Sequence, residues 1–240
     1  MDTYALHDLG TLLAGNPYPG RGIVVGKSAD GRHAAVAYFI MGRSENSRNR
    51  VFAATEDGIR TQAFDPAKLK DPSLIIYHPV RRLENRLIVT NGDQTDTVRD
   101  GLLAGESFSQ ALTRRCFEPD GPNWTPRISA MLTFGGVDFT YEMSILKSAD
   151  AEGTACSRFT FSYPALSGVG HFLHTYVTDG NPVIPTFQGE PERVTIGNDP
   201  EAFASQVWDS LNADNKVSLY INWIDLATGE ESVRIFNKNQ

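Results

Sequence analysis

The chain has 240 residues, of which 40% are hydrophobic and 21% are charged, and its formal net charge at pH 7 is −7. This composition is typical of a globular protein with a hydrophobic core, and it excludes a coiled coil, a collagen-like chain and a charged tail. The negative net charge is opposite to that expected of a general nucleic-acid-binding protein.

Cysteine content and hydropathy indicate the cellular compartment in which the chain is expected to work. Cys116 and Cys156 are too few for a disulfide framework, so we expect both to be reduced and to serve as small buried hydrophobic residues in a cytoplasmic protein. The first residues show no secretion-signal pattern. The longest apolar run covers residues 34–41, which is far short of the roughly 20 residues needed to cross a bilayer. We therefore expect no membrane role.

The first half of the chain predicts one helix followed by strands. Leucines at helical spacing predict a short amphipathic helix over residues 4–14, followed by a proline-containing arm. Asp30-Gly31 and Asp57-Gly58 predict hairpin turns and therefore antiparallel pairing. The strand patterns of this half cover residues 23–26, 34–41, 51–55, 59–64, 74–77 and 86–90.

The second half begins with helices and returns to strands. Residues 95–117 predict two helices with a break near Ala104-Gly105. Gly135-Gly136 predicts a hairpin turn. The remaining patterns predict strands at 128–134, 137–146, 158–163, 170–177 and 216–224, and a helix at 199–211. Some ten strands with the helices in separate blocks predict a layered α+β fold rather than a doubly wound parallel sheet.

A basic segment interrupts two apolar strands at residues 42–50. It holds Arg43, Arg48 and Arg50 with a single glutamate, so it is locally positive within an acidic chain. Guanidinium groups match the geometry of phosphate oxygens, and Ser44 and Asn49 add neutral donors, which favours an anion site. The alternative is a solvated polar loop.

A second polar cluster, residues 90–97, follows a predicted strand and begins a predicted helix. Asp93 or Thr95 could cap this helix, or the junction around Asn91 could hold an anionic ligand on free backbone N–H groups. The segment is neither a Walker loop nor a Gly-x-Gly-x-x-Gly motif.

A proline-containing connector covers residues 117–127. Its three prolines restrict the backbone, which either fixes Glu118, Thr125 and Arg127 for a function or simply makes a rigid loop. His171 and His174 lie three apart in a strand pattern and should point to opposite faces, so we expect no metal site. The aromatic residues predicted to be in the core are Tyr38, Phe39, Phe139, Tyr141, Phe159 and Phe161.

Taken together, these clusters resemble the IMP cyclohydrolase-like family, whose archaeal members catalyse the last step of purine synthesis. The matching pieces lie mostly within residues 18–135. They are Gly20-Arg21-Gly22 with Gly26-Lys27, the segment 42–50, Asn91-Gly92-Asp93-Gln94-Thr95-Asp96 and Thr125-Pro126-Arg127-Ile128, with a later loop at 185–191. The resemblance implies a four-layer αββα sandwich, similar to N-terminal-nucleophile hydrolases, in a single domain over residues 1–240 with an N-terminal helical arm at 1–20.

The resemblance also implies the reaction and its participants. The expected reaction closes 5-formamidoimidazole-4-carboxamide ribonucleotide to inosine monophosphate with loss of water, and that chemistry requires no cofactor or metal. Arg50, Tyr77 and Glu118 are the candidate catalytic residues. The candidate substrate-binding residues are Arg21, Arg43, Ser44, Asn49, Asn91, Asp93, Thr125 and Arg127. The expected partners are a purine nucleotide and copies of the same chain, with no nucleic acid and no membrane.

Two other functions remain open. The fold analogy allows an amide hydrolase with an N-terminal nucleophile, although the chain begins Met1-Asp2 and fold alone does not transfer chemistry. The third possibility is a purine-nucleotide-binding protein without catalysis.

Overall fold

The computed structural model describes residues 2–69, 72 and 75–239. Within them the strands form two antiparallel sheets, one ordered β11-β10-β1-β2-β12-β13 and the other β3-β4-β5-β6-β7-β8-β9. The first sheet contains β1 (Arg21–Lys27), β2 (His33–Met41), β10 (Val169–His174), β11 (Glu192–Thr195), β12 (Lys216–Asp225) and β13 (Glu231–Asn237). The second contains β3 (Arg50–Thr55), β4 (Gly58–Ala63), β5 (Val80–Leu83), β6 (Arg86–Thr90), β7 (Arg127–Gly135), β8 (Asp138–Ser148) and β9 (Cys156–Pro164).

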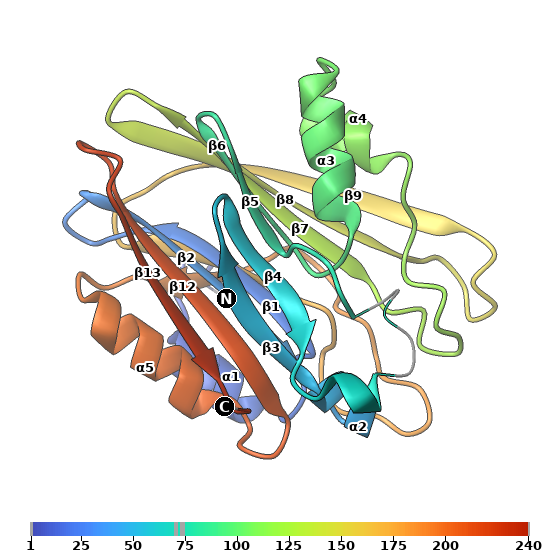
Figure 1. Cartoon of the computed structure of the whole chain (residues 1–240). Helices are drawn as coiled ribbons and strands as arrows, with labels where there is room; N and C mark the ends of the chain where they lie inside the picture. Colours follow the sequence, from blue (N-terminus) through green and yellow to red (C-terminus); the bar gives the residue numbers. More distant parts are fainter. Residues whose placement is uncertain (1, 70–71, 73–74, 240) are drawn as a thin grey trace.

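Helices cover the outer face of each sheet (Figure 1). The helices α1 (Leu9–Gly15) and α5 (Pro200–Ser210) pack on the first sheet through a cluster that includes Leu9, Val207 and Trp223. The helices α3 (Gln94–Leu103) and α4 (Phe108–Leu112) pack on the second sheet through Val98, Phe108 and Met131. The order helix, sheet, sheet, helix confirms the predicted four-layer α+β sandwich. The likeness to N-terminal-nucleophile hydrolases stays a prediction.

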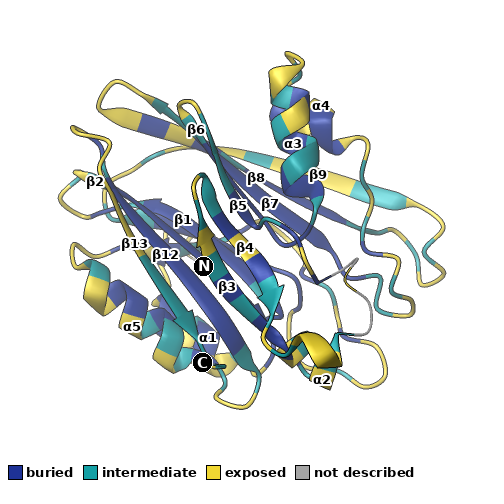
Figure 2. Cartoon of the chain, in the orientation of Figure 1, coloured by how far each residue is buried: buried dark blue, intermediate teal, exposed yellow. Residues whose placement is uncertain are grey.

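The strand β2 shows why the sequence favours this layering. Its residues are buried on both faces because successive side chains point to opposite sides of a strand. Val36 and Tyr38 belong to the core between the sheets, whereas Ala35 and Phe39 belong to the layer beneath the helices. Figure 2 shows the resulting buried centre, with exposed residues on the short helix α2 (Glu45–Arg48).

Several predicted boundaries were wrong. The first helix starts at Leu9, not at residue 4, because the Asp8 carboxylate accepts a hydrogen bond from the Thr11 N–H and caps the helix there. Leu74 of the predicted strand 74–77 lies outside the described residues, and residues 75–77 form a turn instead. The β7–β8 turn is Gly136-Val137 rather than Gly135-Gly136.

Other differences concern the end of a strand, two side chains and three strands that were not predicted. The strand β10 ends at His174 because Thr175 leaves the sheet and donates its N–H to Pro19 and Arg21. Phe159 is 44% exposed because it lies on the edge strand β9, and Cys116 is exposed, so neither is a core residue. The strands β5, β11 and β13 were missed, as were the short helix α2 and the 3-10 turn η1 (Pro66–Lys68).

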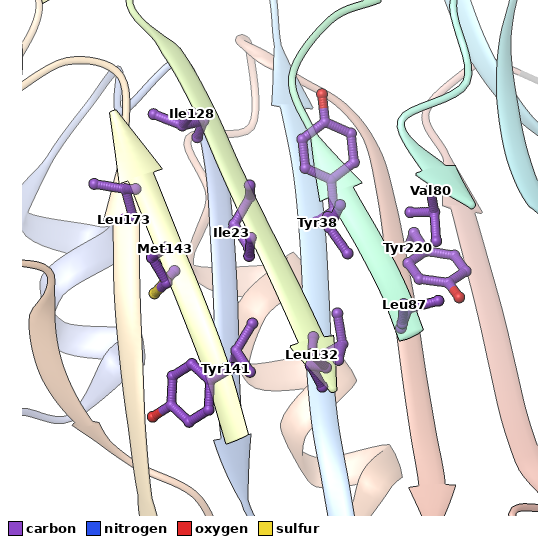
Figure 3. Close-up of a cluster of buried hydrophobic side chains, with 14 of the residues drawn as sticks. Ile23, Tyr38, Val80, Leu87, Ile128, Leu132, Tyr141, Met143, Leu173 and Tyr220 are labelled. Carbon is purple, nitrogen blue, oxygen red and sulfur yellow. The ribbon is translucent and has the colours of Figure 1, made fainter. Parts of the chain in front are cut away.

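Antiparallel pairing gathers the candidate residues at one end of the sandwich. Arg21 at the start of β1 pairs with Ile40 near the end of β2. Arg127 starts β7 beside the end of β6, where Thr90 pairs with Ser129. Tyr38 and Ile128 lie toward this end of the core, and Tyr141 and Leu132 toward the other (Figure 3). At the far end the Lys27 ammonium meets Asp138 at 3.0 Å. None of the helices within the described residues has the length and apolar character to span a membrane.

Candidate active site

A buried ion pair lies at the centre of the candidate site. Arg21 Nη2 is 3.7 Å from Glu118 Oε2, and the two side chains are only 12% and 4% exposed. Burial raises the pKa of Glu118 above its ordinary value, and the nearby charges of Arg21 and Arg127 only partly oppose this rise. Arg21 Nε is buried and has no hydrogen-bond partner within the described part of the chain. The pair therefore combines a carboxyl group that holds its proton more tightly with an available guanidinium donor.

Arg50 is fully buried at the start of β3. Its Nε donates to the Ser47 carbonyl at 2.7 Å and its Nη2 to the Met41 carbonyl at 3.3 Å. Within the described residues no carboxylate lies in ion-pair range of Arg50, and burial together with the charge of Arg21 lowers its pKa. A buried cation with only backbone partners is well suited to an anionic ligand.

Tyr77 carries a phenol into the same region. Its N–H donates to Thr61 Oγ1 at 2.9 Å, and its carbonyl accepts the Thr61 N–H, so the turn that bears it is fixed to β4. Its hydroxyl lies 2.9 Å from that of Tyr38, and both rings are buried. Burial raises the pKa of Tyr38 well above its usual range. Tyr38 was correctly predicted in the core, but this hydroxyl pair was not foreseen.

The connector between α4 and β7 holds Glu118 in place. The Glu118 N–H donates to the Thr125 carbonyl at 2.8 Å, and Thr125 Oγ1 contacts Asp120 and, at 2.5 Å, the Tyr176 hydroxyl. Trp124 adopts a positive φ of 45°, which an L-residue rarely occupies, and its ring donates to the Ala151 carbonyl at 2.9 Å. These contacts make the connector a rigid support.

Two tyrosines that the sequence reasoning missed border the site. Tyr18 and Tyr176 stack with ring centroids 5.8 Å apart, and the guanidinium of Arg43 lies 5.0 Å above Tyr18. Burial raises the pKa of Tyr176 to about 12. Arg43 also pairs with Asp179 and donates to the Gly180 carbonyl at 2.8 Å. The signal available in the sequence was the position of Tyr18 between two prolines, whereas Tyr176 fell inside the predicted strand 170–177.

Arg127, Asp93 and Asn91 form a network beside the ion pair. Arg127 Nη1 donates to Asp93 Oδ1 at 2.8 Å and to Gln94 Oε1 at 2.7 Å. Asp93 stands at the N-cap position directly before α3, but its side chain binds Arg127 and Arg115 instead of capping the helix. The Asn91 amide donates to the Pro126 carbonyl and accepts the Ile128 N–H, so it braces the start of β7.

Two polar residues of the basic segment have structural partners. The Asn49 side chain donates to the Asp65 carbonyl at 2.8 Å and accepts the Asp65 N–H at 2.7 Å. Ser44 is exposed and caps α2 together with Ser47. The segment is therefore partly the solvated loop of the alternative interpretation, while its last residue, Arg50, turns into the interior.

The structure thus brings together only part of the predicted set. The residues at the shared end with mutual contacts or charge interactions are Arg21, Arg50, Tyr77, Glu118, Thr125 and Arg127. Ser44, Asn49 and Asn91 use their side chains elsewhere. A cavity of about 370 Å³ lies at the opposite end, beside the β7–β8 turn, and Asp138 is its one ionisable lining residue. We assign the chemistry to the charged cluster, because a reaction needs groups that move or stabilise charge.

Possible metal ligands are separated. His171 Nδ1 lies 2.6 Å from the Tyr141 hydroxyl between the sheets, whereas His174 packs beside Phe172 on the other face. The predicted opposite orientation is confirmed. Among the described residues no group of three or more His, Cys, Asp or Glu side chains could hold a metal ion.

Comparison with known proteins identifies relatives of the chain. The family model described as IMP cyclohydrolase-like protein matches residues 18–230. Over 163 residues the chain is 31% identical to the IMP cyclohydrolase of Methanococcus aeolicus, covering 66% of this chain and 74% of that protein. It is 31% identical to the IMP cyclohydrolase of Methanopyrus kandleri over 57% of this chain and 72% of the relative. A Methanococcus maripaludis relative of the same name is 35% identical over 48% of this chain and 58% of its own length.

Proposed function

Because this chain belongs to the IMP cyclohydrolase-like family, we propose that it is an IMP cyclohydrolase. The reaction closes 5-formamidoimidazole-4-carboxamide ribonucleotide to inosine monophosphate and releases water. The observation that supports this function most directly is the buried Arg21–Glu118 pair beside Arg50 and Tyr77. The proposal treats residues 1–240 as one catalytic domain.

The ring closure requires few catalytic groups. The carboxamide nitrogen attacks the formyl carbon of the same molecule, so the substrate itself supplies proximity. The enzyme must hold the reactive rotamer, stabilise negative charge on the formyl oxygen and move protons from nitrogen to that oxygen. Two protons leave with the oxygen as water.

Arg21 and Arg50 are the groups that we assign to the formyl oxygen. Both guanidinium groups are buried at the same end of the sandwich, where electrostatic stabilisation is stronger than in water. Arg43 is 34% exposed and can exchange Asp179 for the substrate phosphate at the rim. Asn49 and Asn91 then act through the backbone that they hold, and not by touching substrate.

Glu118 and Tyr77 are the groups that we assign to proton transfer. The raised pKa of Glu118 favours the protonated acid, which can donate to the departing hydroxyl group. Tyr77, paired with Tyr38, donates its hydroxyl proton to the formyl oxyanion while it takes up the proton of the attacking nitrogen. The proton that Glu118 loses with the water is replaced by the one that the former formamido nitrogen releases. Thr125 and Arg127 hold the connector and its carboxyl group in position.

The test is conversion of the formamido ribonucleotide by purified chain, followed by chromatography of inosine monophosphate. We expect turnover above the uncatalysed rate, and Arg50→Ala should reduce it by about 100-fold or more while the fold is retained. Arg86→Ala removes an arginine that pairs with Glu84 away from the site, and it should leave turnover unchanged. Binding of inosine monophosphate without turnover would contradict the enzyme and favour the nucleotide-binding alternative. Near-normal turnover of folded Arg50→Ala would remove Arg50 from the site.

We also propose that the chain acts in the cytoplasm, as its two reduced cysteines suggest, and that it forms a homo-oligomer, as its resemblance to the family implied. Light scattering of the purified protein tests the assembly, and a mass equal to the 26.4 kDa chain would contradict it.

A further inference from the structure

The two cysteines lie 40 positions apart in the sequence but meet at one place in the fold. Cys116 lies after α4, and Cys156 is the first residue of β9. Cys116 and the Phe117 backbone directly after it lie close enough to Cys156 to affect the pKa of its thiol. Both thiols are free.

The guanidinium of Arg158 connects the two cysteine segments. Its Nη1 donates to the Cys156 carbonyl at 3.1 Å, and its Nη2 donates to the Arg115 carbonyl at 2.7 Å and to Cys116 Sγ at 3.5 Å. A cation that donates to a sulfur atom stabilises the negative charge of a thiolate. Arg158 therefore links Cys116 Sγ to the first residue of β9.

The two thiols differ in exposure. Cys116 is exposed, whereas Cys156 is half-buried and packs against the apolar cluster beneath α3 and α4. Burial is also the main cause that raises the pKa of Cys156, with a smaller contribution from its Cys116 neighbour. Arg158 also lines a cavity of about 250 Å³ together with Thr113 and Thr160. This arrangement gives one accessible attacking thiol and one sheltered thiol beside it.

We propose that Cys116 and Cys156 are a redox-reactive dithiol that small disulfides, such as oxidised glutathione, convert into an intramolecular disulfide. The Cys116 thiolate attacks one sulfur of the reagent, forming a mixed disulfide and releasing one thiol. Cys156 loses its proton and attacks Cys116 Sγ, which forms the internal bond and releases the second thiol. The protein loses two electrons and two protons, and the reagent gains both. Glu118 follows Cys116 by two residues, so the bond joins the segment that carries it to β9.

The experiment treats the folded, reduced chain with oxidised glutathione and follows its intact mass, with peptide mapping under non-reducing conditions. The wild type should end two hydrogens lighter, with Cys116 and Cys156 in one crosslinked peptide. Cys156→Ser should stop as the mixed disulfide on Cys116. Cys116→Ser should react more slowly than Cys156→Ser, because the remaining thiol is half-buried.

Arginine variants test the assigned role of Arg158. Arg158→Gln should slow the first step about fivefold, the factor that one ordinary hydrogen bond contributes, and Arg158→Lys should restore part of the rate. Arg86→Gln removes the same charge elsewhere and should react at the wild-type rate. Stable glutathionylation or chain-to-chain crosslinks in the wild type, with no internal bond, would overturn the dithiol. Equal rates for Arg158→Gln and wild type would overturn the role of Arg158.

Discussion

The Glu118 carboxylate lies 3.7 Å from the Arg21 guanidinium and joins the connector before β7 to the first strand of the other sheet. Both side chains are largely withdrawn from water, so the Arg21 charge favours the ionised form of Glu118 while burial favours its protonated form. The contact thus links the packing of the two sheets to the position of the proposed catalytic acid.

Removing one partner of this pair should destabilise the fold. Arg21→Gln leaves the Glu118 carboxyl group buried without its main cation, and we expect the free energy of unfolding to fall by about 3 kcal/mol. Urea unfolding followed by circular dichroism measures the change. The double variant Arg21→Gln/Glu118→Gln should recover part of the loss, whereas additive losses in the double variant would show that the two side chains are not coupled.

The raised pKa of Glu118 predicts a pH dependence of stability. The folded chain binds the Glu118 proton more tightly than the unfolded chain, whose carboxyl group has its ordinary pKa of 4.5. The resulting stabilisation is complete below that value and is lost as the pH rises through the folded pKa. The free energy of unfolding of wild type minus that of Glu118→Gln should therefore decrease as the pH rises above 4.5. An increase over the same range, in parallel urea titrations, would mean that Arg21 lowers the pKa instead.

The architecture could be predicted where apolar periodicity is strong. The pattern of residues 34–41 and the Asp-Gly turns predicted β1 to β4 and their antiparallel pairing. The strand β5 was missed because it is short and its two central residues are arginines, which form ion pairs with Asp57 and Glu231. Tertiary partners, which local sequence does not show, make those residues compatible with a strand.

The sequence offered a candidate site by residue type, and the roles of its residues stay predictions. Arg50 and Glu118 were singled out by their polar segments and Arg21 by the family resemblance, and the fold places them together. Asn49 and Asn91 have the same chemical character in the sequence, yet their amides bind backbone groups at Asp65 and Pro126. Only the three-dimensional structure shows which polar groups already have partners.

The hydroxyl pair of Tyr38 and Tyr77 predicts a kinetic effect. Tyr38→Phe removes the partner of the Tyr77 hydroxyl while preserving ring volume, so kcat should fall about tenfold with little change in KM. Tyr141→Phe is the matched control, because that hydroxyl binds His171 between the same sheets. Steady-state kinetics of both variants measures the difference. Equal kcat values for Tyr38→Phe and wild type would contradict a part for Tyr38 in positioning Tyr77.

The packing of Trp124 makes Gly153 sensitive to substitution. Gly153 has a φ of +73°, and an added Cβ would lie 2.6 Å from the Trp124 ring. Gly153→Ala should lower the free energy of unfolding by about 2 kcal/mol. Gly135→Ala is the control, since its Cβ would meet nothing within 4 Å, and it should be nearly neutral. Thermal unfolding compares the two variants, and equal midpoints would contradict the assigned support of the connector by Trp124.

The central claim is that the buried Arg21–Glu118 pair acts in ring closure. The most direct measurement is the single-turnover rate at which Glu118→Gln, saturated with the formamido ribonucleotide, forms inosine monophosphate. The account predicts a rate about 100-fold or more below wild type, with binding of inosine monophosphate retained. A folded Glu118→Gln chain whose rate stays within about threefold of wild type would contradict it.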